Sequence, residues 1–120
     1  MSVDAALQSA LKPLGLPVFP NKYTGKLTSY IVTNWTMLGE AHGGDFAGAA
    51  RYLVQVHYYL PDKQNPNGML ERILQALAAA DFTSGDVINA HVETSAGNAY
   101  GQHYVIECEY CDGGVNYGAC

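Results

Sequence analysis

Two stretches of the chain place apolar residues at the three- and four-residue spacing of an amphipathic helix. The first covers residues 3–14, where Ser2 can cap the N-terminus and Pro13 helps to end the helix. The second covers residues 66–80, where Pro66 after Asn65 suits the first helical position and Asn67 is an alternative cap. Each pattern predicts a helix with one buried face.

Other stretches alternate apolar and polar residues, which is typical of half-buried strands. Strands are predicted at residues 27–38, 51–60, 87–93 and 100–110, with a turn at 83–86. The segment 18–20 is apolar but contains Pro20, so a strand there is expected to be short or at a sheet edge. In the last strand, His103, Val105, Glu107 and Glu109 share one face.

The predicted succession is α-β-β-β-α-β-β. Short connections favour antiparallel pairing, so we expect an α+β fold: a two-layer sandwich with both helices on one face of a mainly antiparallel sheet. A single domain at residues 1–110 is followed by a glycine- and cysteine-containing tail at 111–120, expected to be irregular. The sheet face opposite the helices would still carry tyrosines and aliphatic residues, which usually marks a contact surface.

Composition agrees with a subunit that is covered by other protein. Of 120 residues, 48% are hydrophobic and only 14% charged, and nine are tyrosines, a balance that resembles interface cores. The net charge is −5 and the six lysines and arginines are scattered singly, which disfavours tight nucleic-acid binding. Neither a secretory signal pattern nor an apolar run of membrane-spanning length is present, so we expect no membrane partner.

The three cysteines, Cys108, Cys111 and Cys120, lie at one end of the chain. Such a set is not a disulfide framework and favours synthesis in a reducing cytoplasm. Cys108 and Cys111 form a Cys-x-x-Cys spacing, so a small zinc or thiol protein that uses them with one histidine is an alternative hypothesis. Within one strand, however, these two residues would point to opposite faces.

Catalytic motifs are weak. The four histidines fall in separate predicted elements, no serine lies in a Gly-x-Ser-x-Gly turn, and the glycines near residue 43 lack the Lys-Ser/Thr ending of a phosphate loop. We therefore expect no enzyme, no metal and no cofactor. A further alternative is a ligand-binding module that holds a small molecule on the apolar sheet face.

Two groups of residues are candidates for contacts. The glycine-rich segment 39–49 reads as a long loop suited to binding a neighbouring subunit or another protein; its candidate contact residues are Gly39, Glu40, His42, Gly43, Gly44, Asp45 and Phe46. The second group is acidic, and in a ring it would line the lumen and repel DNA phosphates, whereas otherwise it is a solvated face; its members are Asp45, Glu93, Glu107 and Glu109.

Several strings, together with the order of elements, resemble the small tail terminator (tail-completion) proteins of long-tailed bacteriophages. The resemblance covers residues 3–110 and rests on pattern rather than on an invariant motif. The strings are PLGLPV at 13–18, YIVT at 30–33, RYLVQVHYY at 51–59, the helix at 69–80 after a Pro-Asn-Gly turn, and YVIECEY at 104–110.

This resemblance implies a structural virion protein without catalytic residues. Family members form a ring, typically a hexamer, at the head-proximal end of the tail tube, where they end tube polymerisation and join the tail to the head connector. The implied partners are other copies of the chain, the tail tube protein and the head connector or head-completion protein, while DNA passes through without specific binding. The implied location is the tail neck of the virion, with assembly in the host cytoplasm. Another head-tail connector or a minor capsid component is the alternative within this class.

Overall fold

The structure is a computed structural model that describes residues 2–38, 50–90 and 101–112. Within these ranges it is a two-layer α+β domain, which confirms the predicted fold class. The elements, in chain order, are helix α1 (Val3–Leu11), the 3-10 helix η1 (Lys12–Leu14), strands β1 (Val18–Pro20), β2 (Tyr30–Met37) and β3 (Ala50–Pro61), helix α2 (Asn67–Ala79), and strands β4 (Thr83–Asn89) and β5 (Gly101–Asp112).

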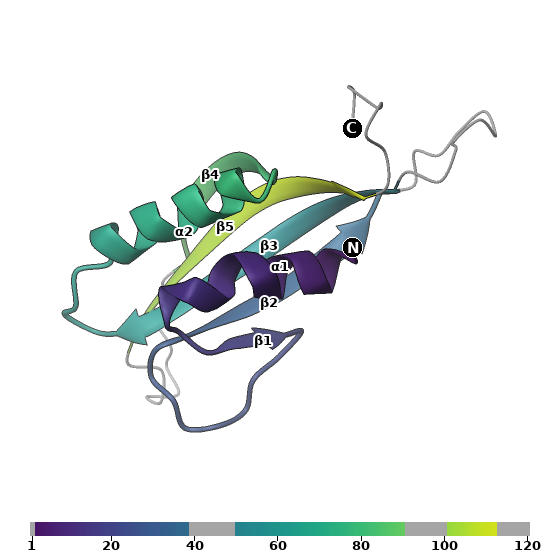
Figure 1. The fold of residues 1–120 in the computed structure, drawn as a ribbon. Coiled ribbons are helices and arrows are strands. Elements are labelled where there is room, and N and C mark those ends of the chain that lie inside the picture. Colours follow the sequence, from purple (N-terminus) through teal and green to yellow (C-terminus); the bar gives the residue numbers. More distant parts are fainter. Residues whose placement is uncertain (1, 39–49, 91–100, 113–120) are drawn as a thin grey trace.

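The strands form one sheet in the order β1-β2-β3-β5-β4 (Figure 1). β1 pairs with β2 in parallel, and the other three pairings are antiparallel. β1 is short and lies at the edge, as its proline predicted. The long strands β3 and β5 form the centre, with twelve residues each.

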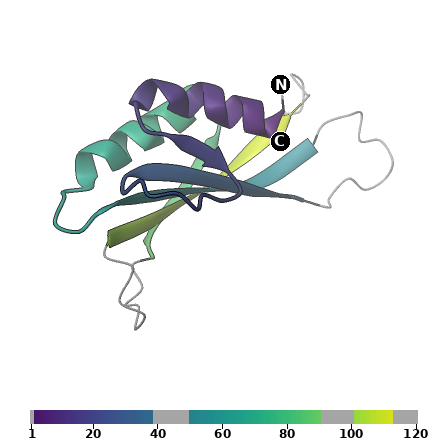
Figure 2. The ribbon, with the colours of Figure 1, turned by 90° about the horizontal axis from the view of Figure 1, so that it is seen from below.

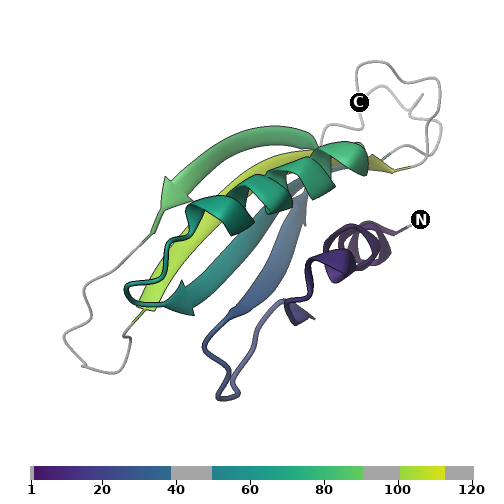
Figure 3. The same ribbon diagram turned by 60° about the vertical axis from the view of Figure 1, so that its left-hand side comes forward.

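Both helices pack on the same face of the sheet, and no described element covers the other face (Figures 2 and 3). The core lies between the two layers. It consists mainly of fully buried aliphatic side chains from both layers: Leu7 and Leu11 of α1, Ile73 and Leu77 of α2, and Ile31, Val54, Val56, Leu60 and Ile106 of the sheet. Burial of this apolar surface is the main source of stability.

The helix starts follow local hydrogen bonding. Ser2 Oγ accepts from the Ala5 amide at 3.1 Å, so Ser2 caps α1 as predicted. α2 begins at Asn67, one residue after the predicted first helical residue Pro66. The side chain of Asn65 accepts from the Asn67 amide at 2.9 Å, which satisfies one of the free donors at this end.

Three predictions about strand limits are wrong. The strand expected at residues 27–38 is β2, which covers only Tyr30–Met37. Residues 83–86, expected to turn, belong to β4, because the backbone of β5 already pairs with Thr83 and a register shift between Ser84 and Val87 absorbs the irregularity. β4 ends at Asn89, and residues 91–93 of the predicted strand lie outside the described residues. β5 continues to Asp112 opposite Ala50, so the first two residues of the predicted irregular tail are in a strand.

Candidate interaction surface

The sheet face that points away from the helices is here called the open face. Strand register and the alternation of side chains place on it both residues of each cross-strand pair that does not face the core. Its members are Phe19 of β1, Tyr30, Val32, Asn34 and Thr36 of β2, Arg51, Leu53, Gln55, His57 and Tyr59 of β3, His103, Val105, Glu107, Glu109 and Cys111 of β5, and Ile88 of β4.

Aromatic rings cross the open face from β1 to β5. Tyr23, just after β1, stacks on Phe19 with ring centroids 4.3 Å apart and lies 4.7 Å from Tyr30. Tyr59 then stacks on Tyr30 at 4.7 Å and on His103 at 4.3 Å. Burial, with the neighbouring tyrosine as the smaller cause, raises the pKa of Tyr30 and of Tyr59, so both phenols are neutral. These five residues, the aromatic row, form a continuous surface of large rings.

A hydrogen-bonded chain of three polar residues lies beside the aromatic row. Asn34 Nδ2 is 3.0 Å from His57 Nε2, and His57 Nδ1 is 2.8 Å from His103 Nε2. With neutral rings, Asn34 donates to His57 and His57 donates to His103, so each contact has one donor and one acceptor. Burial lowers the pKa of His57; burial and then the neighbouring His57 lower the pKa of His103.

The histidine pair was not foreseen, because His57 and His103 are far apart in sequence with no shared spacing. They meet because Tyr59 lies opposite His103 and Val105 opposite His57, which places the two histidines on a diagonal of the open face. The contacts of the pair are Asn34, each other and the stacked ring of Tyr59. Burial of the pair thus favours the neutral form of both rings.

The lowered histidine pKa values predict a pH-dependent stability. In the unfolded chain these histidines titrate near the ordinary value of 6.5, above their folded-state pKa values, so the unfolded state binds protons first as the pH falls. The free energy of unfolding is therefore expected to be greatest above pH 6.5 and to decrease below it. Urea unfolding at several pH values above the carboxylate range, about 5 to 8, measures this. The double variant His57→Gln/His103→Gln should lose most of the slope; an unchanged slope contradicts the assignment.

The two described members of the acidic group, Glu107 and Glu109, both have polar partners on β3. Glu109 Oε1 accepts from Arg51 Nε at 3.0 Å in an ion pair, and Glu107 Oε2 accepts from Gln55 Nε2 at 3.3 Å. Both glutamates lie on the open face, as their alternation predicted. Asp45 and Glu93, and the candidate loop residues Gly39, Glu40, His42, Gly43, Gly44 and Phe46, lie outside the described residues.

The cysteines of β5 face opposite sides of the sheet. Cys108 lies opposite Val54 in the core and is 2% exposed, whereas Cys111 lies opposite Arg51 on the open face. Burial, with a smaller contribution from Glu109, raises the pKa of the Cys108 thiol to about 12. Cys111 is disulfide-bonded. The two side chains therefore point away from each other within β5.

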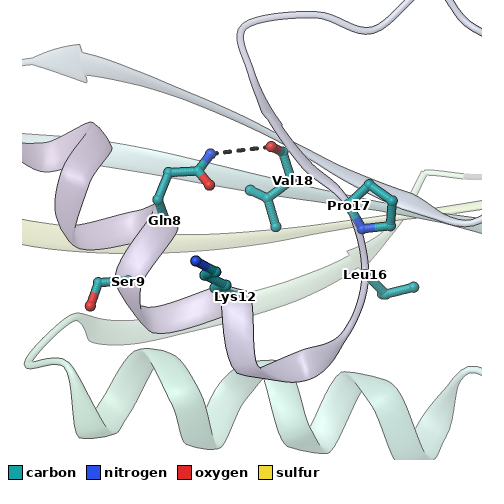
Figure 4. A pocket seen from close by; sticks show the side chains of 6 residues that line it. All are labelled: Gln8, Ser9, Lys12, Leu16, Pro17 and Val18. Carbon is teal, nitrogen blue, oxygen red and sulfur yellow. Dashed lines mark hydrogen bonds between the residues drawn. The ribbon is translucent and has the colours of Figure 1, made fainter.

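A hollow of about 590 Å³ lies between the end of α1 and β1, lined by Gln8, Ser9, Lys12, Leu16, Pro17 and Val18 (Figure 4). Gln8 Nε2 donates to the Val18 carbonyl at 3.2 Å and so occupies an acceptor on β1. Lys12 is the one charged residue of this lining, and the hollow is separate from the open face. Within the described ranges, no three histidine, cysteine or acidic residues gather as metal ligands.

No protein-family model matches the chain, and no curated protein is significantly similar to it. Among the helices of the described segments, none has the length and apolar character needed to cross a membrane. The fold and surface thus define a class: a two-layer α+β domain whose open face carries an aromatic row and a neutral histidine pair.

Proposed function

We propose that this protein is a structural subunit of a bacteriophage tail, a tail terminator that forms a ring between the tail tube and the head connector. The observation that carries the proposal is the open face. The resemblance of residues 3–110 to tail terminators supplies the particular role, and the apolar character of the face supports the physical requirement for protein contacts.

Beside its polar residues, the open face carries large apolar side chains that the outer face of an antiparallel sheet does not normally present to water. It carries the aromatic row, and two of its aliphatic residues, Leu53 and Ile88, are 37% and 42% exposed. Val32 and Val105 on the same face are already buried beneath their neighbours. Aromatic and aliphatic surface with few charges is what the centre of a protein interface requires.

The charges of the open face suit passage of DNA better than binding of DNA. Its cation, Arg51, is held by Glu109, and Glu107 adds negative charge. Phosphate binding needs several available cations on one surface. We therefore propose that DNA passes without specific contacts, and that this chain needs neither a cofactor nor a catalytic residue for its role.

The direct test is loss of the gene. In the phage that encodes this chain, deletion of the coding sequence is expected to give abnormally long tails that do not join heads, and the wild-type gene supplied in trans restores normal particles. Electron microscopy of lysates measures both outcomes. Tails of normal length, or a genome without tail genes beside this one, contradict the proposal; normal tails without heads indicate another connector component instead.

A pair of variants tests whether the open face carries the contacts. Leu53→Glu places a charge on the open face, whereas Ala78→Glu places one on the exposed surface of α2. Complementation is expected to fail with Leu53→Glu and succeed with Ala78→Glu, while both purified proteins retain wild-type circular dichroism. The reverse result would locate the contact on the helix side and contradict the proposed use of the open face.

A further inference from the structure

The two edges of the sheet carry opposite charge beside exposed apolar residues. β1 and β4 are the edge strands and lie on opposite sides of the domain (Figure 1). The basic edge consists of Lys12, Lys22, Lys26 and Leu27, around β1. The acidic edge consists of Asp81, Asp86, Val87 and Ile88, in β4 and the turn before it.

The basic edge is presented by a folded loop. Lys22, Lys26 and Leu27 are all exposed, and Leu27 is 46% exposed, which is high for a large aliphatic residue. The Tyr23 hydroxyl accepts from the Leu27 amide at 2.9 Å while its ring stacks on Phe19, which ties the loop to β1. This anchoring gives the lysines and Leu27 a defined place, so binding here costs little conformational entropy.

The acidic edge is equally well anchored. The Phe82 amide donates to the Leu77 carbonyl at 2.9 Å, which fixes the turn that carries the exposed Asp81. Asp86 is exposed in β4, where Val87 and Ile88 are 40% and 42% exposed on its two sides. As an edge strand, β4 has one side without a neighbouring strand.

The other charged residues of the described segments do not change this distribution of charge between the two edges. Most are paired or have an adjacent opposite charge: Arg51 with Glu109, Asp62 with Lys63, and Glu71 with Arg72. Asp4, on α1, accepts from Trp35 Nε1 at 3.0 Å. Glu107 lies on β5, next to β4, and adds to the negative charge on that side. Among the side chains that the structure describes, one edge of the sheet is therefore positive and the other negative.

We infer that the basic edge of one copy docks against the acidic edge of the next copy of this chain. Opposite charges would orient the two copies, and Leu27 would pack against one of the two exposed aliphatic residues of β4, Val87 or Ile88. Two different surfaces in contact make a heterologous, head-to-tail interface, which produces a closed ring when the rotation per copy closes. Closure into a ring rests on the proposed function; the pairing of the two edges rests on their charge complementarity.

Charge reversal tests the pairing. Self-association of purified wild-type protein is measured by sedimentation over a concentration series that reaches the millimolar range, and it is expected to weaken with added salt. Lys22→Glu/Lys26→Glu and Asp81→Lys/Asp86→Lys should each raise the dissociation constant by roughly tenfold to a hundredfold. The matched control Asp62→Lys/Lys63→Asp exchanges charges away from both edges and should leave association unchanged. Circular dichroism verifies that each variant is folded.

Restored association between complementary variants is the strongest test. Mixing the two double variants joins a chain with two acidic edges to one with two basic edges, so association is expected to return in the mixture. The quadruple variant, with both edges reversed, should associate by itself like the wild type. A monomeric wild type at every concentration, or association insensitive to both reversals, overturns the inference. Deletion of the gene tests the function independently: edge pairing without a tail defect would refute only the terminator role.

Discussion

Replacing Leu77 by alanine is expected to lower the free energy of unfolding by about 2–5 kcal/mol. Leu77 lies on the inner face of α2, is 0% exposed and belongs to the core cluster that joins α2 to the sheet. Removing its side chain loses buried apolar surface and leaves a cavity that the surrounding helix and strands fill only in part. Urea unfolding followed by circular dichroism measures the change.

The matched control is Leu53→Ala, the same substitution on the open face. Leu53 is 37% exposed, so its truncation removes less buried surface and leaves no enclosed cavity. Its unfolding free energy is expected to change by less than about 1 kcal/mol. Equal losses for the two variants would show that the open face is as buried in solution as the core, and would contradict the two-layer description of a separate subunit.

Replacing Gly85 by alanine is expected to destabilise the fold by about 1–3 kcal/mol, the usual cost of forcing an extra group into a packed site. A Cβ at this position would overlap the Glu107 carbonyl oxygen, which belongs to the backbone of β5 and has little room to move. Gly85 falls within the register shift between Ser84 and Val87, where β4 approaches β5 closely. The expected loss appears as a lower midpoint in urea or heat unfolding.

Gly68→Ala is the control for this substitution, and its expected sign is opposite. Gly68 lies in the first turn of α2, and a Cβ there meets no atom within 4 Å. Alanine should stabilise the protein by up to about 1 kcal/mol, because it restricts the unfolded chain and favours the helix. If both glycine variants changed stability in the same direction, the close approach of Gly85 to β5 would not be the cause.

Local features of the sequence predicted most of the elements. The spacing of Leu7, Leu11, Ile73 and Leu77 predicted both helices, and Pro20 predicted a short edge strand, because these signals act within a few residues. The alternation in residues 104–110 also placed Cys108 inside and Glu107 and Glu109 outside. The prediction of a turn at residues 83–86 was wrong. Serine, glycine and aspartate favour turns locally, but the pairing of this segment with β5 overrides that preference.

The candidate surface was foreseen only in outline. The strands carry apolar residues on both faces, and two helices can cover only one, so the sequence predicted an uncovered face with tyrosines. The most specific feature of that face, the His57–His103 pair, depends on the register of β3 against β5. The register depends on how two segments 46 residues apart pair with each other, so neither segment alone determines it.

By itself the sequence determined the periodicities, and with them the helices, the strand faces and the α+β class, because hydrophobic spacing dictates which side of an element is buried. The tertiary structure alone decided the strand order and register. Strand order places the lysines beside β1 and the aspartates beside β4 on opposite edges, and register brings two distant histidines within a hydrogen bond. Both arise from packing between segments, where the free energy depends on contacts that no single segment contains.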